Sequence, residues 1–136
     1  MKLKTKRRKY LREATVMLAI AQTAVRCVPA SRLLAWACRT PARINHFSQD
    51  EVAWITWSVE RIGSKQWMKA FCLARALAAQ AMLRRRGIAS RLCLGVAPGG
   101  EQLAAHAWLE LAHEIVIGGE EAPRFQRLVE FGGKPP

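Results

Sequence analysis

The chain lacks the residue spacing of a metal site or of a disulfide framework. Its four cysteines contain no C-x-x-C pair, and its three histidines are not grouped with them. A zinc site needs about four ligands at compact spacing, so we expect neither a metal nor another cofactor. Four cysteines in 136 residues are also fewer than a disulfide-stapled domain carries. We therefore expect free thiols and a reducing compartment, the cytoplasm.

Long apolar runs are also missing. The best candidate, residues 14–25, follows a basic start and is too short to span a bilayer. A basic segment before a short apolar run is also the form of a secretory signal, but no A-x-A site with a polar mature start follows. Apolar periodicity instead continues to Trp36. We expect a basic tail over 1–12, then an amphipathic helix, and no transmembrane segment.

Acidic residues are scarce. The chain has 10 Asp and Glu against 22 Lys and Arg, a net charge of +12, and only one Asp, Asp50. With 51% hydrophobic and 24% charged residues, disorder and low-complexity arrays are excluded, and the length suits one domain. The basic surplus either meets an anionic partner or keeps the chain soluble. Only Tyr10 lies among the first basic residues, so we do not expect nucleic-acid binding.

The expected helices come first and the expected strands last. Apolar periodicity and cap signals predict helices over 10–27, 31–38, 48–61 and 70–86. Strands are predicted over 88–96, 106–111 and 115–117. The last stretch, 123–131, fits a short helix or a final strand. This order predicts an α+β fold, with helices packed on a small antiparallel sheet of about three strands.

Cys72 and His106 form the candidate catalytic pair. Cys72 lies at the start of the helix predicted over 70–86, where the positive end of the macrodipole favours thiolate over thiol. His106 opens a strand that follows a Gly-rich turn. A cysteine at a helix start and a base on a neighbouring strand are typical of thiol proteases. The alternative is that both residues are structural.

The sequence around this pair resembles the transglutaminase-like leader peptidase of lasso peptide biosynthesis, which is the protease half of the lasso B protein. The resemblance covers about residues 66–119. It rests on Cys72-Leu73, on Leu83-Arg84-Arg85-Arg86-Gly87-Ile88 and on Ala105-His106-Ala107-Trp108-Leu109-Glu110. It implies a papain-like fold of the transglutaminase kind and one domain over 1–136. We divide that domain into the basic tail, a helical cover (13–65), a catalytic core (66–122) and a C-terminal segment (123–136).

The resemblance implies a cysteine endopeptidase that cuts a lasso precursor peptide between leader and core. A separate ATP-dependent cyclase then closes the freed core. Leader binding in this family often belongs to a small winged-helix-like domain, the RiPP recognition element, which needs strands of its own. Because the region before Cys72 is predicted to be helical, we expect the stand-alone protease half. Its partners are then the precursor, a separate leader-binding protein and, in the same pathway, the cyclase.

The resemblance assigns Cys72 as nucleophile and His106 as base. The family places an orienting Asp about twelve residues after the His, where this chain has Gly118. Glu120 takes that role if the strand continues, accepting the Nδ1–H and leaving Nε2 for Cys72; a backbone carbonyl or a water is the alternative. Gln66 has the papain-type spacing for an oxyanion donor beside the Cys72 N–H, or is a solvated loop residue.

Two rival functions remain open. The first is a basic helical module that binds nucleic acid or an anionic surface, with the Cys–His pair merely structural. The second is a transglutaminase-like acyl transferase that passes the thioester to an amine instead of water. The other three cysteines are interpreted as packing residues, and Trp67 and Trp108 as cleft walls or core.

Overall fold

The structure is a computed structural model, and it describes residues 2–39, 48–99, 102–119, 123 and 125–131. In these residues the helices precede the strands: α1 (Lys2–Cys27), α2 (Ala30–Ala37), α3 (Gln49–Gly63), α4 (Cys72–Arg85), β1 (Arg91–Gly99), β2 (Gln102–Leu111), β3 (Glu114–Ile117) and β4 (Gln126–Phe131). The sheet has the order β3-β2-β1-β4, and each neighbouring pair is antiparallel. The predicted α+β fold is confirmed. A fourth strand is present because the last stretch pairs with β1.

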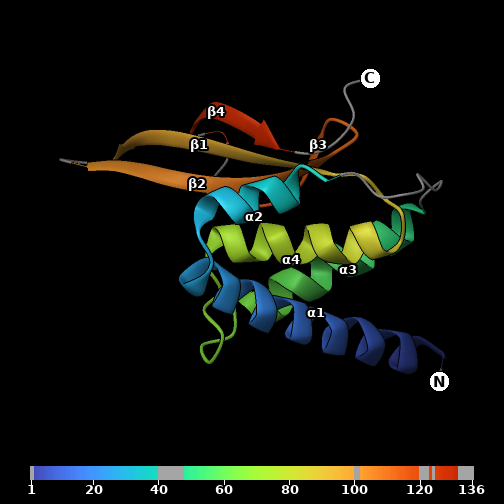
Figure 1. The fold of residues 1–136 in the computed structure, drawn as a ribbon. Helices are drawn as coiled ribbons and strands as arrows, with labels where there is room; N and C mark the ends of the chain where they lie inside the picture. The colour runs from blue at the N-terminus through green and yellow to red at the C-terminus, as the bar shows by residue number, and fades with distance from the viewer. Residues whose placement is uncertain (1, 40–47, 100–101, 120–122, 124, 132–136) are drawn as a thin grey trace.

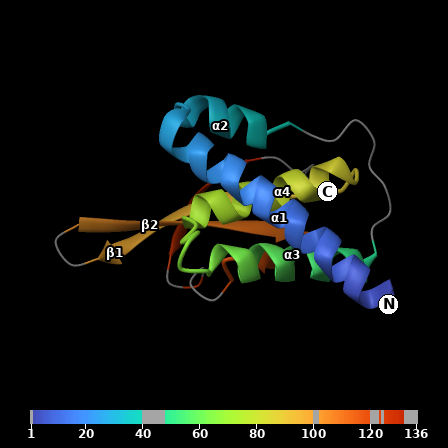
Figure 2. The ribbon, with the colours of Figure 1, turned by 90° about the horizontal axis from the view of Figure 1, so that it is seen from below.

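Helix α4 lies at the centre of the molecule, between the sheet and α1 (Figure 1). Seen from below, α1 crosses α4 and α3 (Figure 2). Eight of the 14 residues of α4 are buried, and many of them are Ala, whose small side chain allows neighbouring elements to approach closely. Ala and Leu also have the highest helix propensities. A helix that is apolar on most sides is stable only when it is covered, so the strongest helix signal of the sequence becomes the core of the fold.

The end of α4 is closed by a Schellman motif. Gly87 has a φ of +73°, a conformation that glycine adopts without strain. The N–H of Ile88 donates to the carbonyl of Leu83, and the N–H of Gly87 donates to that of Arg84, both at 3.0 Å. The turn directs the chain from the helix into β1.

The three arginines before Gly87 bind other helices. Arg86 donates to both carboxylate oxygens of Glu13 on α1, at 2.9 and 2.6 Å, and its Nε lies 2.9 Å from Glu51 on α3. Arg85 also pairs with Glu13. Arg84 lies over the ring of Trp36 on α2, 4.1 Å from its centroid. This basic cluster therefore joins α4 to all three other helices.

The basic segment at the N-terminus is helical, so its interpretation as a tail is wrong. Residues from Lys2 onward form the first turns of α1, because they include no Gly or Pro and Lys and Arg are good helix formers. Lys6 and Arg7 lie over the rings of Trp54 and Trp57 on α3, 5.8 and 5.5 Å from the centroids. Tyr10 is buried and stacks on Trp54. None of the described helices has both the length and the apolar character that a membrane crossing requires.

Side chains alternate along β2 between two faces of the sheet. Ala107, Leu109 and Leu111 pack in the helical core, while Trp108 belongs to a second cluster with Cys93. Strand β3 pairs with β2 only between Leu109 and Leu111. His106 therefore lies beyond the paired stretch of β3, beside Gly118, and is buried with 6% of its surface exposed.

Candidate active site

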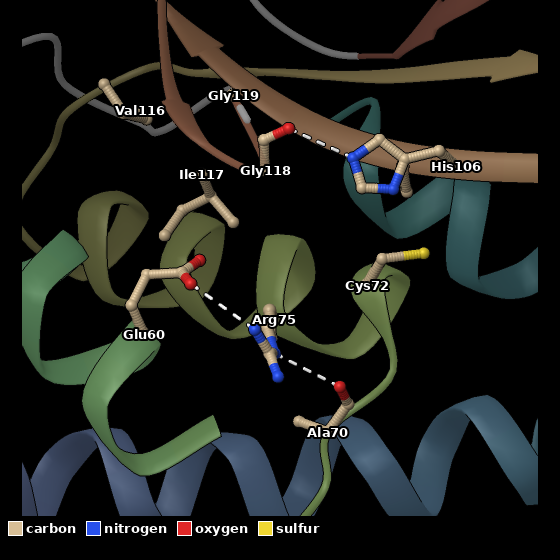
Figure 3. A pocket seen from close by; sticks show the side chains of 10 residues that line it. Glu60, Ala70, Cys72, Arg75, His106, Val116, Ile117, Gly118 and Gly119 are labelled. Carbon is tan, nitrogen blue, oxygen red and sulfur yellow. Dashed lines mark hydrogen bonds and ion pairs between the residues drawn. The ribbon is translucent and has the colours of Figure 1, made fainter. Parts of the chain in front are cut away.

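A pocket of about 600 Å³ opens between the start of α4, the end of α3 and the edge of the sheet (Figure 3). Its lining includes the side chains of Cys72, Arg75 and His106, together with Glu60 and Gly118. The structure thus brings together the two residues that the sequence singled out as nucleophile and base. They come from positions 34 residues apart, on α4 and β2.

Cys72 is the first residue of α4, as predicted. The residue before it, Phe71, has extended backbone, and no side chain caps the helix. The N–H groups of a first helical turn have no intrahelical acceptor. The backbone N–H of Cys72 is therefore a candidate oxyanion donor beside its own sulfur.

The loop that leads to Cys72 is held by Gln22 of α1. This side chain is buried, with 9% of its surface exposed. Its Oε1 accepts a hydrogen bond from the N–H of Phe71 at 3.1 Å, and its Nε2 donates to the carbonyl of Lys69 at 3.4 Å. Lys69 has a φ of +39°, which an L residue adopts only when its surroundings hold it there. Gln22 is a positioning residue that the sequence did not reveal, because the contact spans 49 residues.

Arg75 ties the end of α3 to the start of α4. Its guanidinium donates to the carbonyls of Ala70 and Gly63, at 3.1 and 3.0 Å, and lies 3.4 Å from the carboxylate of Glu60. A Cβ at Gly63 would lie 3.0 Å from Nε of Arg75, so the close approach needs glycine. One arginine therefore fixes the pocket wall opposite His106 (Figure 3).

The His106 imidazole is oriented by the main chain. Its Nε2 lies 3.1 Å from the carbonyl oxygen of Gly118. Figure 3 shows the other ring nitrogen, Nδ1, on the side of the ring that faces Cys72. A proton on Nε2 donates to the carbonyl and leaves Nδ1 as the acceptor. The expected roles of the two nitrogens, with Nε2 facing the thiol, are therefore wrong.

Two aromatic rings pack against the imidazole. The centroid of Trp108 lies 6.0 Å from that of His106, and the centroid of Phe125 lies 5.0 Å away. Trp108 is buried, its Nε1 donates to Glu110 at 3.2 Å, and Glu110 also pairs with Arg127. Of the two interpretations of Trp108, the core position is the one observed. Trp108 nevertheless contributes to the site by supporting the base.

Gly118 stands at the position where the sequence resemblance implies an Asp, and its backbone carbonyl contacts His106. Its φ is +78°, and an added Cβ would lie 3.0 Å from Nε2 of His106. A carboxylate cannot be carried at this position without displacing the imidazole. Strand β3 ends at Ile117, and Glu120 lies outside the described residues.

Gln66 and Trp67 lie away from the pocket. Both are exposed in the turn before α4, Trp67 with 66% of its surface accessible, and neither lines the pocket. The papain-type spacing of Gln66 thus does not bring its side chain to Cys72 in this structure. A turn between Gln66 and Cys72 directs the Gln66 side chain to solvent.

All four cysteines are free thiols, but they differ in exposure. Cys93 is fully buried, which confirms it as a packing residue. Cys27 and Cys38 are exposed, so the packing interpretation of these two is wrong: they lie at the C-terminal ends of α1 and α2, outside the core. The described residues contain no cluster of His, Cys, Asp and Glu that would hold a metal ion.

Comparison with protein families identifies the class. The model of the transglutaminase-like superfamily matches residues 14–130. The chain belongs to the transglutaminase-like superfamily, and its helices and antiparallel sheet have the arrangement expected of that fold. Members of this superfamily are generally cysteine-type enzymes, peptidases or acyl transferases. Comparison with curated proteins and with solved structures gives no significant match.

Proposed function

We propose that this chain is a cysteine endopeptidase that removes the leader peptide from a lasso peptide precursor. The observation that carries the proposal is the shared pocket of Cys72 and His106, in which Gly118 orients the imidazole. Superfamily membership supports a cysteine-based reaction. The sequence motifs around the pair support the finer assignment to the protease half of the lasso B protein.

The reaction follows from the positions of the two residues. Nδ1 of His106 takes the thiol proton of Cys72, and the sulfur attacks the carbonyl carbon of the last leader residue. The Cys72 N–H stabilises the oxyanion. The C–N bond breaks, Nδ1 returns the proton to the core amine, and the leader is left as a thioester. Water, deprotonated by the same nitrogen, then hydrolyses the thioester, so that the leader ends in a carboxylate.

The catalytic machinery is a Cys–His dyad with a main-chain orienting group. In a triad, the third member fixes the tautomer and the direction of the imidazole. The carbonyl of Gly118 performs both tasks for His106, and the stacked rings of Trp108 and Phe125 restrict rotation. A carboxylate at Glu120 is then not needed for orientation.

The partners follow from the same assignment. We propose that a separate leader-binding protein presents the precursor and that the lasso cyclase acts next on the released core. The four free thiols favour a reducing compartment, the cytoplasm. A nucleic-acid partner is less well supported, because Arg86 is paired with Glu13 and Glu51 within the fold.

The proposal is tested by incubating the chain with a lasso precursor and its leader-binding protein and following the products by mass spectrometry. Cys72→Ala should abolish cleavage while the protein stays folded, with stability changed by at most about 2 kcal/mol. Cys93→Ala is the buried control and should cut at a near-native rate per folded molecule. Cleavage by Cys72→Ala at the normal rate would end the thiol-protease proposal.

The acyl-transferase alternative is decided by the product. Hydrolysis leaves a carboxylate at the end of the leader, whereas transfer leaves an amide when a primary amine is added in excess. A leader product that carries the amine as its main form would replace the peptidase with a transferase.

Activation of the thiol is tested separately by alkylation. Because Cys27 and Cys38 are exposed, they are first replaced by Ser. In that background, iodoacetamide at about neutral pH should label Cys72 at least about tenfold faster than a model thiol, and His106→Gln should remove the difference. Equal labelling rates would favour the structural interpretation of the pair.

A further inference from the structure

An apolar groove lies on the helical side of the molecule, away from the active-site pocket. It has a volume of about 590 Å³ and runs between α1, α2 and α4. Its apolar lining includes Met17, Ile20, Val28, Leu33, Trp36 and Leu77. None of these residues lines the pocket of Cys72 and His106. The groove is therefore a separate surface feature.

Two of the apolar side chains in the groove are open to solvent. Ile20 is 59% exposed and Val28 is 36% exposed. Burying such exposed apolar side chains against a partner removes them from water, which favours association. The groove lies between helices at a concave place, which suits the insertion of side chains from a helix or an extended segment.

The charge at the groove is of one sign. Its lining includes Arg32, Arg84 and Arg85, and no Asp or Glu lines it in the part of the chain that the structure describes. Arg84 donates to the carbonyls of Trp36 and Ala37, at 2.8 and 3.3 Å.

The contacts that Arg84 makes to the Trp36 and Ala37 carbonyls and to the Trp36 ring do not neutralise its charge. Burial, assisted by the nearby Arg39, lowers the pKa of Arg84 from its usual value. Arg85 shares the single carboxylate of Glu13 with Arg86. A positive rim of this kind attracts and orients an anionic partner.

We propose that this groove docks an acidic amphipathic segment of a partner protein. Its apolar side chains enter between α1, α2 and α4, and its carboxylates face Arg32, Arg84 and Arg85. A second copy of the chain is a poor occupant, because each copy carries a net charge of +12 and the two repel. The docking does not involve the Cys72 thiol, so it holds whether or not the proposed peptidase activity is correct.

The test measures binding by the full chain carrying Cys72→Ala, by fluorescence anisotropy. The probe is a labelled helical peptide of about four turns with Leu on one face and Glu elsewhere. One control peptide has Lys in place of Glu, and another has Ser in place of Leu. The acidic Leu peptide should bind at least about tenfold more tightly than either control, and its affinity should fall with added salt. Equal affinity for all three peptides would overturn the proposal.

Matched variants test whether the peptide binds in the groove. Ile20→Glu should weaken the acidic peptide at least about tenfold, whereas Leu3→Glu, an equally charged change at another exposed site on α1, should change it less than about twofold. Arg32→Gln should lower the affinity for the acidic peptide about threefold or more. Arg8→Gln, at another exposed arginine, should leave that affinity unchanged. Equal effects within each pair would refute the assignment of the groove. Self-association abolished by Ile20→Glu would instead make a second copy the occupant and overturn the acidic partner.

Discussion

The imidazole of His106, the proposed base, lies against the backbone of Gly118: Nε2 and the carbonyl oxygen are 3.1 Å apart. A carbonyl has no proton to gain or lose at ordinary pH. This partner of the imidazole therefore stays the same at every pH at which the protein is folded. The contact also depends on a backbone conformation, φ +78°, that glycine adopts without strain. A side chain at this position would be strained and would press on the imidazole.

Gly118→Ala should slow precursor cleavage by about 10- to 100-fold. The added Cβ would lie 3.0 Å from Nε2 in a backbone conformation unfavourable for Ala, so the imidazole must shift. The measurement is kcat per folded molecule. Gly119→Ala is the matched control, because its Cβ meets Ile115 at 3.3 Å and not the imidazole. Similar rates for the two variants would show that Gly118 does not set the orientation.

Glu120→Gln should cut the precursor within about twofold of the native rate, because the carbonyl of Gly118 already orients His106. Glu121→Gln serves as the neighbouring control and should behave in the same way. Steady-state cleavage by both variants is compared at saturating precursor. A slowing of about tenfold or more that is confined to Glu120→Gln would restore a carboxylate as third catalytic member.

Gln22→Met should lower kcat by about tenfold, since it removes both hydrogen bonds that hold the loop before Cys72. Gln80→Met is the control. Gln80 is also buried, and its Nε2 donates to Ala37 and Ser90, away from Cys72. Gln80→Met should lower the unfolding temperature but leave kcat per folded molecule unchanged. A fall in kcat of equal size for both variants would assign Gln22 a general structural role.

Glu13→Gln should destabilise the fold by about 2 kcal/mol at neutral pH, because Glu13 accepts charged hydrogen bonds from Arg85 and Arg86. The hydrogen bond from Arg86 lowers the pKa of Glu13 in the folded protein, against the opposing effect of burial. The stabilisation is therefore complete above the ordinary value of 4.5 and is lost as the pH falls through the lower, folded pKa.

Urea unfolding across this pH range measures the difference between wild type and Glu13→Gln. The difference should shrink below about pH 4.5. A difference that stays constant with pH would mean that Glu13 acts through packing alone. Glu60→Gln, at a more exposed pair with Arg75, should cost less than about 1 kcal/mol.

Local signals in the sequence were sufficient for most of the helices and strands and for placing Cys72 and His106 on a helix start and a strand. The Ala- and Leu-rich helix was predicted over 70–86 and runs from Cys72 to Arg85, since propensity and the Gly87 cap are properties of neighbouring residues. Cys72 at the helix start and His106 on a strand likewise follow from local patterns. The length of α1 was underestimated, because its charged first turns have no apolar periodicity to count.

What the sequence could not supply depends on contacts between distant residues or on the backbone. A backbone carbonyl has no signature in the sequence, so the group that orients His106 was left open among Glu120, a carbonyl and a water. Gln22 reaches a loop 49 residues away, and no spacing rule connects such positions. Likewise, no pattern in the sequence shows that Arg86 binds Glu13 and Glu51 on two other helices.

The central position of α4 affects how the protein unfolds. Its amides are shielded by the sheet on one side and by α1 on the other, so local fraying cannot release them. Hydrogen exchange along α4 should therefore be among the slowest in the chain and require global unfolding. A fragment limited to residues 66–119 would expose the α1-facing side of the helix and lose that protection. Cys72 is thus attached to the helix that we expect to unfold last.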